Sequence, residues 1–288
     1  MSIPAALRDD APLLTAGMDV GSSTVKASVM EDRGPAGARL VAGRAERIRK
    51  RDPARVAEGL LEELLREAGL KRADLAYVAT TGEGETITNR PGHFDGMTTH
   101  ARGGLFLEPA ARAIVDVGAL HARAVLMDGR AKVLGYRMTN QCASGSGQFL
   151  ENICRYLGVT LEEIGPLSLT AAAPEKCSSI CAVLAETDVI NMVSRGIATA
   201  DILRGIHQSM AGRYVRLLLS SGATGVALVT GGLAADVGLI ASMREAAAES
   251  KSTADIRSHP LSVQAGSIGA ALWGAFRARR MLREGVAA

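Results

Sequence analysis

The sequence predicts an α/β protein made of two similarly built halves. The segment LLTAGMDVGSSTVKASVM, residues 13–30, has the pattern of an apolar strand, a turn at Asp-Val-Gly and a second strand with alternating apolar residues. The segment ARAIVDVGALHARAVLM, residues 111–127, repeats this pattern. One repeat at such a distance indicates two related halves rather than a solenoid with a short period. We expect the halves to be residues 1–109 and 110–288, with the last helix packing either on its own half or back on the first.

The other expected elements follow from local patterns in chain order. Pro53 suits the first turn of a helix, and Gly69 suits the position after its end. A pair of glycines, Gly231 and Gly232, ends an apolar strand. The remaining elements are expected at 39–47 (strand), 53–68 (helix), 75–82 (strand), 131–138 (strand), 145 onward (largely helical), 199–220 (long helix), 226–230 (final strand) and 264–280 (last helix).

Composition excludes several classes of protein. With 288 residues, 47% of them hydrophobic, the chain can bury a substantial core. Its 33 basic and 30 acidic residues form a mixed surface, and 3% aromatic residues are too few for base-stacking platforms, so nucleic-acid binding is not indicated. No apolar run approaches the ~20 residues of a membrane span. The start of the chain, MSIPAALRDDAPLL, lacks the pattern of a signal peptide. We therefore expect a cytoplasmic protein whose four cysteines are reduced thiols or metal ligands rather than disulfides.

The run Asp-Val-Gly-Ser-Ser-Thr is typical of a phosphate-binding turn. Glycine lets the backbone approach an anion, successive amides and hydroxyls donate to phosphate oxygens, and a carboxylate at the strand end can hold Mg²⁺ through water. A single run of this kind is more simply a tight hairpin with a polar turn. Two such runs followed by a strand and Gly231-Gly232, where an adenosine could lie flat against the backbone, favour a nucleotide site. The P-loop and G-x-G-x-x-G motifs are absent, so another phosphate-binding fold is required.

These motifs resemble those of a known superfamily. DVGSST, DVGA, VTGGLA and AGSIGAAL are similar to the two phosphate motifs, the adenosine motif and the connecting motif of the actin, hexokinase and Hsp70 ATPases. More narrowly, ATTGEGE, MTTHARG, QCASGSGQFLENI and SSICAVLAETDVINMVSRG resemble the activator ATPases of 2-hydroxyacyl-CoA dehydratases and benzoyl-CoA reductases, and most of all the delta-type ATPase subunits of the ATP-dependent reductases. The resemblance covers nearly the whole chain.

The resemblance implies two RNase-H-like halves with a nucleotide cleft between them, ATP and Mg²⁺ as ligands, and a set of binding residues. Asp19, which would also hold Mg²⁺, and Asp116 are the implied catalytic residues. The implied ATP-binding residues are Gly21, Ser22, Ser23, Thr24, Lys26, Gly118, Ala119, Gly231, Gly232 and Leu233.

The resemblance also implies a 4Fe-4S cluster shared between two ATPase subunits, with Cys142 and Cys181 as the thiolates of this chain. A cysteine just before a helix is suited to this role, because free amides and the helix dipole stabilise a thiolate. Two ligands cannot complete a four-thiolate cluster, so a partner must supply the others. The alternative is that both are ordinary buried thiols. Cys154 lies on an apolar helical face and is expected in the core, whereas Cys177 is left open; a zinc site of all four lacks a C-x-x-C pair.

The implied function is that of an ATP-hydrolysing electron-activation subunit of a benzoyl-CoA reductase. Its partners would be a homologous ATPase subunit and the ring-reducing catalytic subunits, with ferredoxin as electron donor. The alternatives are a homodimeric activator of a 2-hydroxyacyl-CoA dehydratase, a sugar kinase of the same superfamily and an actin-like structural ATPase. The last two need no iron, and the two cluster cysteines argue against them.

The second phosphate turn departs from the dehydratase activators, which by resemblance have Gly-Gly-Gln-Asp where this chain has Gly118-Ala119-Leu120-His121. The difference favours the reductase subunit. It leaves the water-positioning group open, with Asp116 as the best candidate and His121 either catalytic or merely solvent-facing. Four other polar residues are also ambiguous: His100 and Arg102 fit a domain interface as well as a ligand site, and Glu83 and Glu85 fit a solvated turn.

Overall fold

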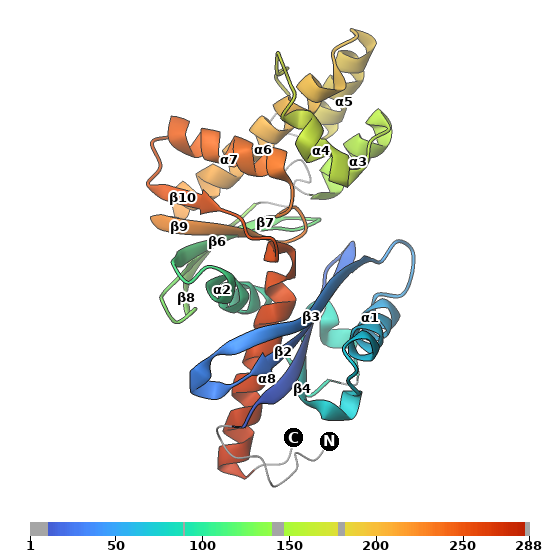
Figure 1. Ribbon diagram of the computed structural model, residues 1–288. Helices are drawn as coiled ribbons and strands as arrows, with labels where there is room; N and C mark the ends of the chain where they lie inside the picture. The colour runs from blue at the N-terminus through green and yellow to red at the C-terminus, as the bar shows by residue number, and fades with distance from the viewer. Residues whose placement is uncertain (1–10, 89, 140–146, 178–181, 286–288) are drawn as a thin grey trace. The chain divides into compact units, whose positions relative to one another are not determined.

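The structure is a computed structural model that describes residues 11–88, 90–139, 147–177 and 182–285, and the chain divides into two compact units (Figure 1). In the described residues each unit contains a five-stranded mixed sheet. The division runs as follows: unit 1 is Met1–Leu107, Arg130–Lys132 and Val263–Ala288, and unit 2 is Glu108–Gly129 and Val133–Ser262.

The sheet of unit 1 begins with the predicted hairpin and has the strand order β3-β2-β1-β4-β5. The first strand pairs antiparallel with the second and parallel with the fourth. The strands predicted at 13–30, 39–47 and 75–82 are confirmed. The strands are β1 (Leu13–Val20), β2 (Thr24–Asp32), β3 (Ala38–Arg47), β4 (Leu75–Gly82) and β5 (Gly92–His93), and the helices of this unit are α1 (Pro53–Glu67), α2 (Gly96–Leu107) and α8 (Ala265–Glu284).

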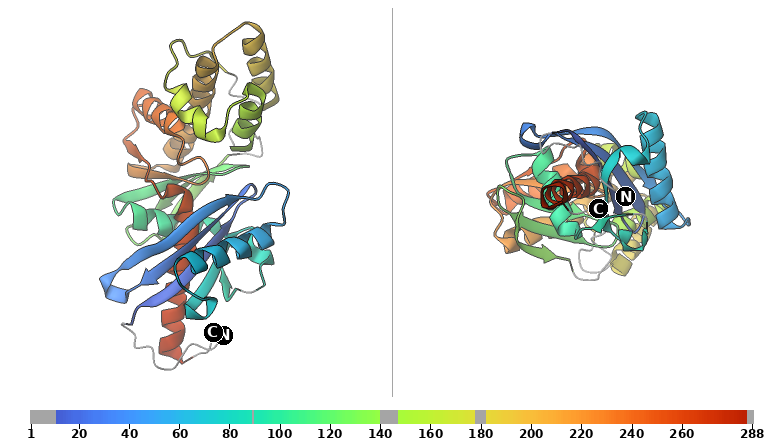
Figure 2. Two further views of the ribbon diagram at one scale, coloured as in Figure 1. Left: turned by 45° about the vertical axis from the view of Figure 1, so that its right-hand side comes forward. Right: turned by 90° about the horizontal axis from the view of Figure 1, so that it is seen from below.

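The alternation of side chains along β1 distributes the helices of unit 1 over both faces of its sheet. Ala16 and Met18 belong to an apolar core with Leu60 and Leu61 of α1. Thr15 and Gly17, which alternate with them, face α8: the hydroxyl of Thr15 donates to the carbonyl of Ala271 at 3.0 Å, and a Cβ on Gly17 would lie 2.0 Å from the carbonyl oxygen of Ser267. The period of two in a strand therefore places α1 on one face and α8 on the other (Figures 1 and 2). Asp52 caps the first turn of α1, as its side chain accepts from the amide of Arg55.

Helix α2 packs closely on α8 because glycines stand at their crossing. A Cβ on Gly103 would lie 1.9 Å from the carbonyl oxygen of Ala265, and one on Gly269 would lie 1.8 Å from that of Thr99. Both distances are far below any real contact and involve backbone atoms, which no side-chain rotation can move aside. The backbones of α2 and α8 touch directly at these two positions.

We expect Gly269→Ala to destabilise unit 1 by ~1–3 kcal/mol or more, because the added methyl group must push two helices apart. The matched control is Gly59→Ala in the interior of α1, where nothing lies within 4 Å of the added carbon. That change should stabilise the helix by about 0.5–1 kcal/mol. Thermal unfolding of both variants measures the difference, and equal melting temperatures would contradict the packing described here.

The sheet of unit 2 repeats the hairpin at its centre, in the order β10-β9-β6-β7-β8. Helices α6 and α7 pack on this sheet, whereas α3, α4 and α5 pack mainly on other helices (Figure 1). The strands are β6 (Ala111–Val117), β7 (Ala122–Met127), β8 (Val133–Met138), β9 (Gly225–Thr230) and β10 (Ala254–Arg257), and the helices are α3 (Gly147–Leu157), α4 (Leu161–Ser168), α5 (Ala182–Ser194), α6 (Thr199–Ser221) and α7 (Val237–Glu249).

A buried polar cluster joins three of the helices in unit 2. Nδ1 of His207 on α6 lies 2.8 Å from the hydroxyl of Ser168 at the end of α4, and Nε2 lies 3.0 Å from Oδ2 of Asp236. The other carboxylate oxygen of Asp236 accepts from the first amides of α7, so the residue is also the helix cap. His207 and Ser168 are fully buried, so these three residues hold the helices together and are closed to a substrate.

The expected elements differ from the structure in a few places. The strand at 226–230, predicted to be the last, is followed by β10, whose four residues carry no apolar run. Helices α2 and α7 were not predicted, and the last helix extends to Glu284 rather than 280. Among the described residues, no helix is both long and apolar enough to cross a membrane.

Candidate functional site

The first hairpin places a carboxylate and an ammonium group opposite each other. Asp19 is the second-last residue of β1, and Lys26 on β2 is its cross-strand partner. Nζ of Lys26 lies 3.2 Å from Oδ2 of Asp19, and both side chains are only 8% exposed. Two opposite charges taken out of water stabilise each other only in close contact, so the register of this hairpin is well defined at the strand end.

The turn that follows is open to solvent and rich in donors. The amide of Gly21 donates to the carbonyl of Thr24 at 3.0 Å and closes the turn. The side chain of Ser22 is exposed, and those of Ser23 and Thr24 are partly exposed. A glycine turn with accessible hydroxyls beside a buried carboxylate and cation has the donor set that a phosphate and its metal ion require.

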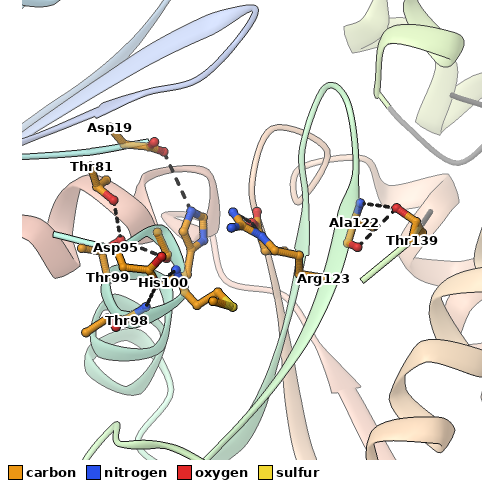
Figure 3. Close-up of polar contacts among 12 residues, drawn as sticks. Asp19, Thr81, Asp95, Thr98, Thr99, His100, Ala122, Arg123 and Thr139 are labelled. Atoms are coloured by element: carbon orange, nitrogen blue, oxygen red, sulfur yellow. Dashed lines mark hydrogen bonds and ion pairs between the residues drawn. The ribbon is translucent and has the colours of Figure 1, made fainter. Parts of the chain in front are cut away.

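His100 on α2 lies beside Asp19, which sequence reasoning did not foresee (Figure 3). Its Nε2 is 3.9 Å from Oδ2 of Asp19, and the ring is buried. Gly266 at the start of α8 makes room for the two side chains, since a Cβ there would lie 2.7 Å from Oδ2 of Asp19 and 2.8 Å from Nε2 of His100. The first carboxylate is thus enclosed by β2, α2 and α8.

The other ambiguous residues of unit 1 lie elsewhere. Arg102 lines a separate surface hollow of about 390 Å³ together with Phe106 and Phe276. Glu83 and Glu85 are exposed residues around the turn after β4, which agrees with the solvated-turn alternative.

The second hairpin repeats the geometry of the first. Asp116 is the second-last residue of β6, and its cross-strand partner on β7 is Arg123. Nε and Nη2 of Arg123 donate to Oδ2 of Asp116 at 3.1 and 2.6 Å. The amide of Gly118 donates to the carbonyl of His121 at 3.0 Å, the counterpart of the bond from Gly21 to Thr24. Arg123 was missed in the sequence, although it follows Asp116 at the same separation as Lys26 follows Asp19.

Leu120 and His121, the two residues by which this turn differs from that of the dehydratase activators, face solvent. The side chains of Leu120 and His121 are both exposed, Leu120 by 50%. The backbone of the turn has a structural partner instead: the amides of Gly147 and Gln148 at the start of α3 donate to the carbonyls of Gly118 and Ala119, both at 2.9 Å. The second hairpin therefore anchors the helix that follows the segment containing Cys142.

The glycine turn after β9 lies against the second hairpin. Gly231 has a φ of +87°, which favours glycine, and a Cβ on it would lie 2.5 Å from Oδ1 of Asp116. The amide of Leu233 approaches the carbonyl of Val117 at 3.4 Å. Around Gly232 nothing lies within 4 Å of an added carbon, so its surface is open for a flat ligand. Unit 2 thus brings the predicted adenosine turn next to the carboxylate of the second phosphate hairpin.

Of the cysteines, only Cys154 and Cys177 lie among the described residues, and Cys142 and Cys181 lie outside them. Cys154 is buried as predicted, and burial raises the pKa of its thiol to about 12. The thiol of Cys177 lies 4.0 Å from the carbonyl oxygen of Ala185. Within the described ranges, no three His, Cys, Asp or Glu side chains are grouped as metal ligands.

The chain is similar to known ATPases along almost its whole length. The family model described as "BadF/BadG/BcrA/BcrD ATPase family" matches residues 16–274. Over 273 residues the chain is 57% identical to a subunit of the benzoyl-CoA reductase of Thauera aromatica, covering 94% of this chain and 96% of that protein. It is 32% identical to the activator of lactoyl-CoA dehydratase of Anaerotignum propionicum, covering 91% and 97%.

The fold is similar to that of a solved activator. The structure of the activator of the 2-hydroxyisocaproyl-CoA dehydratase from Clostridium difficile, with bound ADPNP, matches with a TM-score of 0.85 and 28% identity over 94% of this chain and 98% of that one. This similarity confirms the predicted actin- and hexokinase-like fold. Together with two hairpins of the same construction, the matches show that the chain is a member of the BadF/BadG/BcrA/BcrD ATPase family.

Proposed function

We propose that this protein is the ATP-hydrolysing electron-activation subunit of a benzoyl-CoA reductase. The observation that carries the proposal is the 57% identity over 94% of the chain to a subunit of that enzyme. The repeated hairpins support it, because each presents a carboxylate, a cation and a glycine turn at one strand end. These are the groups that phosphoryl transfer requires, since its catalysis depends on positioning and charge neutralisation.

We assign the ATP-binding residues by their chemistry. Hydroxyls and amides of the first turn would bind the β- and γ-phosphates, and Lys26 would neutralise part of their charge. The carboxylate of Asp19 would hold the hydrated Mg²⁺, and that of Asp116 would orient the attacking water or the metal. The remaining assignments are Gly21, Ser22, Ser23 and Thr24 for the first phosphate turn, Gly118 and Ala119 for the second, and Gly231, Gly232 and Leu233 for adenosine.

We further propose that Cys142 and Cys181 are the two ligands of this chain to a 4Fe-4S cluster shared with a homologous ATPase subunit. When bound, the cluster would supply an electron of very low potential, toward the lower end of the iron–sulfur range, which reaches about −700 mV. The described neighbours suit such ligands: α5 begins directly after Cys181, where helical amides lack internal partners. Cys154 does not suit the role, because its side chain is buried with the apolar residues of α3.

A route for coupling follows from the bonds between the second hairpin and α3. A change at the turn carbonyls of Gly118 and Ala119 on hydrolysis would act directly on the first amides of α3. That helix follows the segment that carries Cys142. A small shift at the turn can therefore be passed to the surroundings of the ligand and change their polarity and hydrogen bonding, which tune a cluster's potential.

We also propose partners and a compartment for this chain. The ring-reducing subunits would bind the acyl-CoA, a ferredoxin would supply electrons, and the complex would be cytoplasmic. A second candidate is a homodimeric activator of a 2-hydroxyacyl-CoA dehydratase, which is favoured by the similarity to the activators of lactoyl-CoA and 2-hydroxyisocaproyl-CoA dehydratases. Exposed Leu120 and His121, which take the place of the carboxamide and carboxylate that the resemblance gives those activators, favour the reductase.

The test is anaerobic co-production of the chain with the homologous ATPase subunit and the ring-reducing subunits. We expect a brown hetero-oligomer that hydrolyses ATP and, with reduced ferredoxin, reduces benzoyl-CoA only while ATP is hydrolysed. The chain produced alone is the control. A stable, iron-containing homodimer that activates a 2-hydroxyacyl-CoA dehydratase would support the second candidate, and a colourless protein with sugar-dependent ADP formation would contradict both.

A further inference from the structure

The two hairpins share a feature beyond their glycine turns, which is a cation paired in register with the aspartate. Asp19 is opposite Lys26, and Asp116 is opposite Arg123. In each pair the aspartate is the second-last residue of the first strand, and the cation contacts its Oδ2. The first cation belongs to a hairpin whose turn we assign to phosphate binding. The repeat therefore gives Arg123 the same place in the second hairpin.

We propose that Arg123 is a catalytic residue that binds the terminal phosphates of the nucleotide, as the counterpart of Lys26. The proposal rests on the proposed function, since it names a ligand of that same ATP site. The side chain of Arg123 is 21% exposed and that of Asp116 is 7% exposed, so the guanidinium is the more accessible group of the pair. An anion that approaches this strand end would meet the guanidinium before the carboxylate.

The chemistry of the guanidinium allows it to serve two anions at once. It carries five N–H donors in one plane, of which Nε and Nη2 contact Asp116, both on the same oxygen. Without Arg123, the buried negative charge of Asp116 would repel a phosphate at the same turn. With it, the strand end is close to neutral before the nucleotide binds and can accept the charge of a phosphate. The positive charge of Lys26 thus neutralises Asp19 in the first hairpin, and that of Arg123 neutralises Asp116 in the second.

A phosphate-binding role of Arg123 can be distinguished from a purely structural role by comparing ligands with different numbers of phosphates. A cation that contacts the β- or γ-phosphate strengthens the binding of ADP and ATP but not of AMP, whereas a residue that only supports the fold affects all three alike. Arg137→Gln on β8 is the matched control. This arginine lies on the neighbouring strand, is exposed and donates only locally, to the carbonyl of Tyr136, among the bonds described. It carries the same charge, but its cross-strand partner is Ala124, so its side chain lies on the opposite face of the sheet from that of Arg123.

The experiment is calorimetric titration of the full chain with AMP, ADP and ATP, without and with Mg²⁺. We expect Arg123→Gln to weaken ADP and ATP binding by about tenfold and to leave AMP unchanged, because a charge-assisted bond to phosphate is lost. Arg123→Lys should recover most of the affinity. Arg137→Gln should match the wild type for all three. Melting temperatures of each variant report on folding.

Asp116→Asn keeps the guanidinium and removes its ion pair, so it tests the proposal even if Arg123→Gln does not fold. Without Mg²⁺ this variant should bind ATP at least as tightly as the wild type. Equal losses for AMP, ADP and ATP in Arg123→Gln, unchanged binding of all three, or weaker Mg²⁺-free ATP binding in Asp116→Asn would each overturn the assignment. A wild-type chain that binds no nucleotide would instead contradict the proposed function itself.

Discussion

Asp116→Ala and Asp19→Ala are each expected to abolish Mg-ATP hydrolysis while leaving the iron content of the complex near normal. Each change removes a carboxylate from the strand end where we place the phosphates and Mg²⁺. Loss of one such electrostatic group costs about 3–4 kcal/mol of transition-state stabilisation, or roughly 10²–10³ in kcat. The measurement is the ATPase rate and the iron content of the assembled complex.

The two variants differ in what they do to the fold. Asp19→Ala leaves the ammonium group of Lys26 buried without its carboxylate, which costs ~3–5 kcal/mol when an ion pair is broken inside a protein. Asp116→Ala leaves a partly exposed guanidinium, so its cost to stability is smaller. Asp116→Ala is therefore the cleaner test, and melting temperatures of both should show this order.

The control is Asp255→Ala, which removes an exposed carboxylate from the edge strand of the same sheet as Asp116. It should leave hydrolysis and melting temperature nearly unchanged. If Asp19→Ala and Asp116→Ala both retain the wild-type rate in folded complexes, the phosphate assignment is wrong.

The hairpins could be predicted because the sequence pattern that specifies each of them lies within a short stretch of neighbouring residues. Alternating apolar residues on both sides of a glycine turn specify two paired strands, and their register follows from the length of the turn. The sequence assigned Asp19 and Lys26 to one phosphate site, and the structure pairs them across the hairpin. Arg123 could have been found in the same way, since register alone places it opposite Asp116. The more conspicuous residues of that hairpin, Leu120 and His121, face solvent.

Helix α2 could not be predicted because its stability comes from a distant part of the chain. Its sequence, GMTTHARGGLFL, contains three glycines and two threonines, all poor helix formers. The absence of a side chain at Gly103 is favourable only because the backbone of Ala265 in α8 lies against this position. The position of His100 beside Asp19 depends on this same packing, so the sequence left its role ambiguous.

The start of helix α7 could have been predicted from the sequence, whereas the buried cluster of His207, Ser168 and Asp236 could not. Asp236 directly before α7 is a local cap signal that could have predicted the helix start. That the same carboxylate also faces His207, with Ser168 on the other side of the ring, depends on how three helices pack. No local pattern in the sequence contains that information.

Replacing Cys142 or Cys181 by Ser is expected to leave the cluster labile or absent, to stop electron transfer, and to leave ATP binding intact. A serine hydroxyl is a harder ligand than a thiolate and ionises less easily, so it binds iron poorly. The nucleotide residues lie in other segments of the chain, which is why ATP affinity should survive. Iron content and the paramagnetic resonance spectrum of the reduced complex, purified anaerobically with its partner subunits, measure the outcome.

The two remaining cysteines provide the controls for this experiment. Cys154→Ser should keep the cluster and cost about 1 kcal/mol of stability, because it places a hydroxyl in a buried apolar environment on α3. Cys177→Ser should also keep the cluster, with at most a shifted potential, since the thiol of Cys177 faces the carbonyl of Ala185. If Cys142→Ser and Cys181→Ser retain a full cluster with the native spectrum, the two residues are ordinary thiols and the iron is held elsewhere. Loss of the cluster in these two variants alone would instead assign both ligands of this chain.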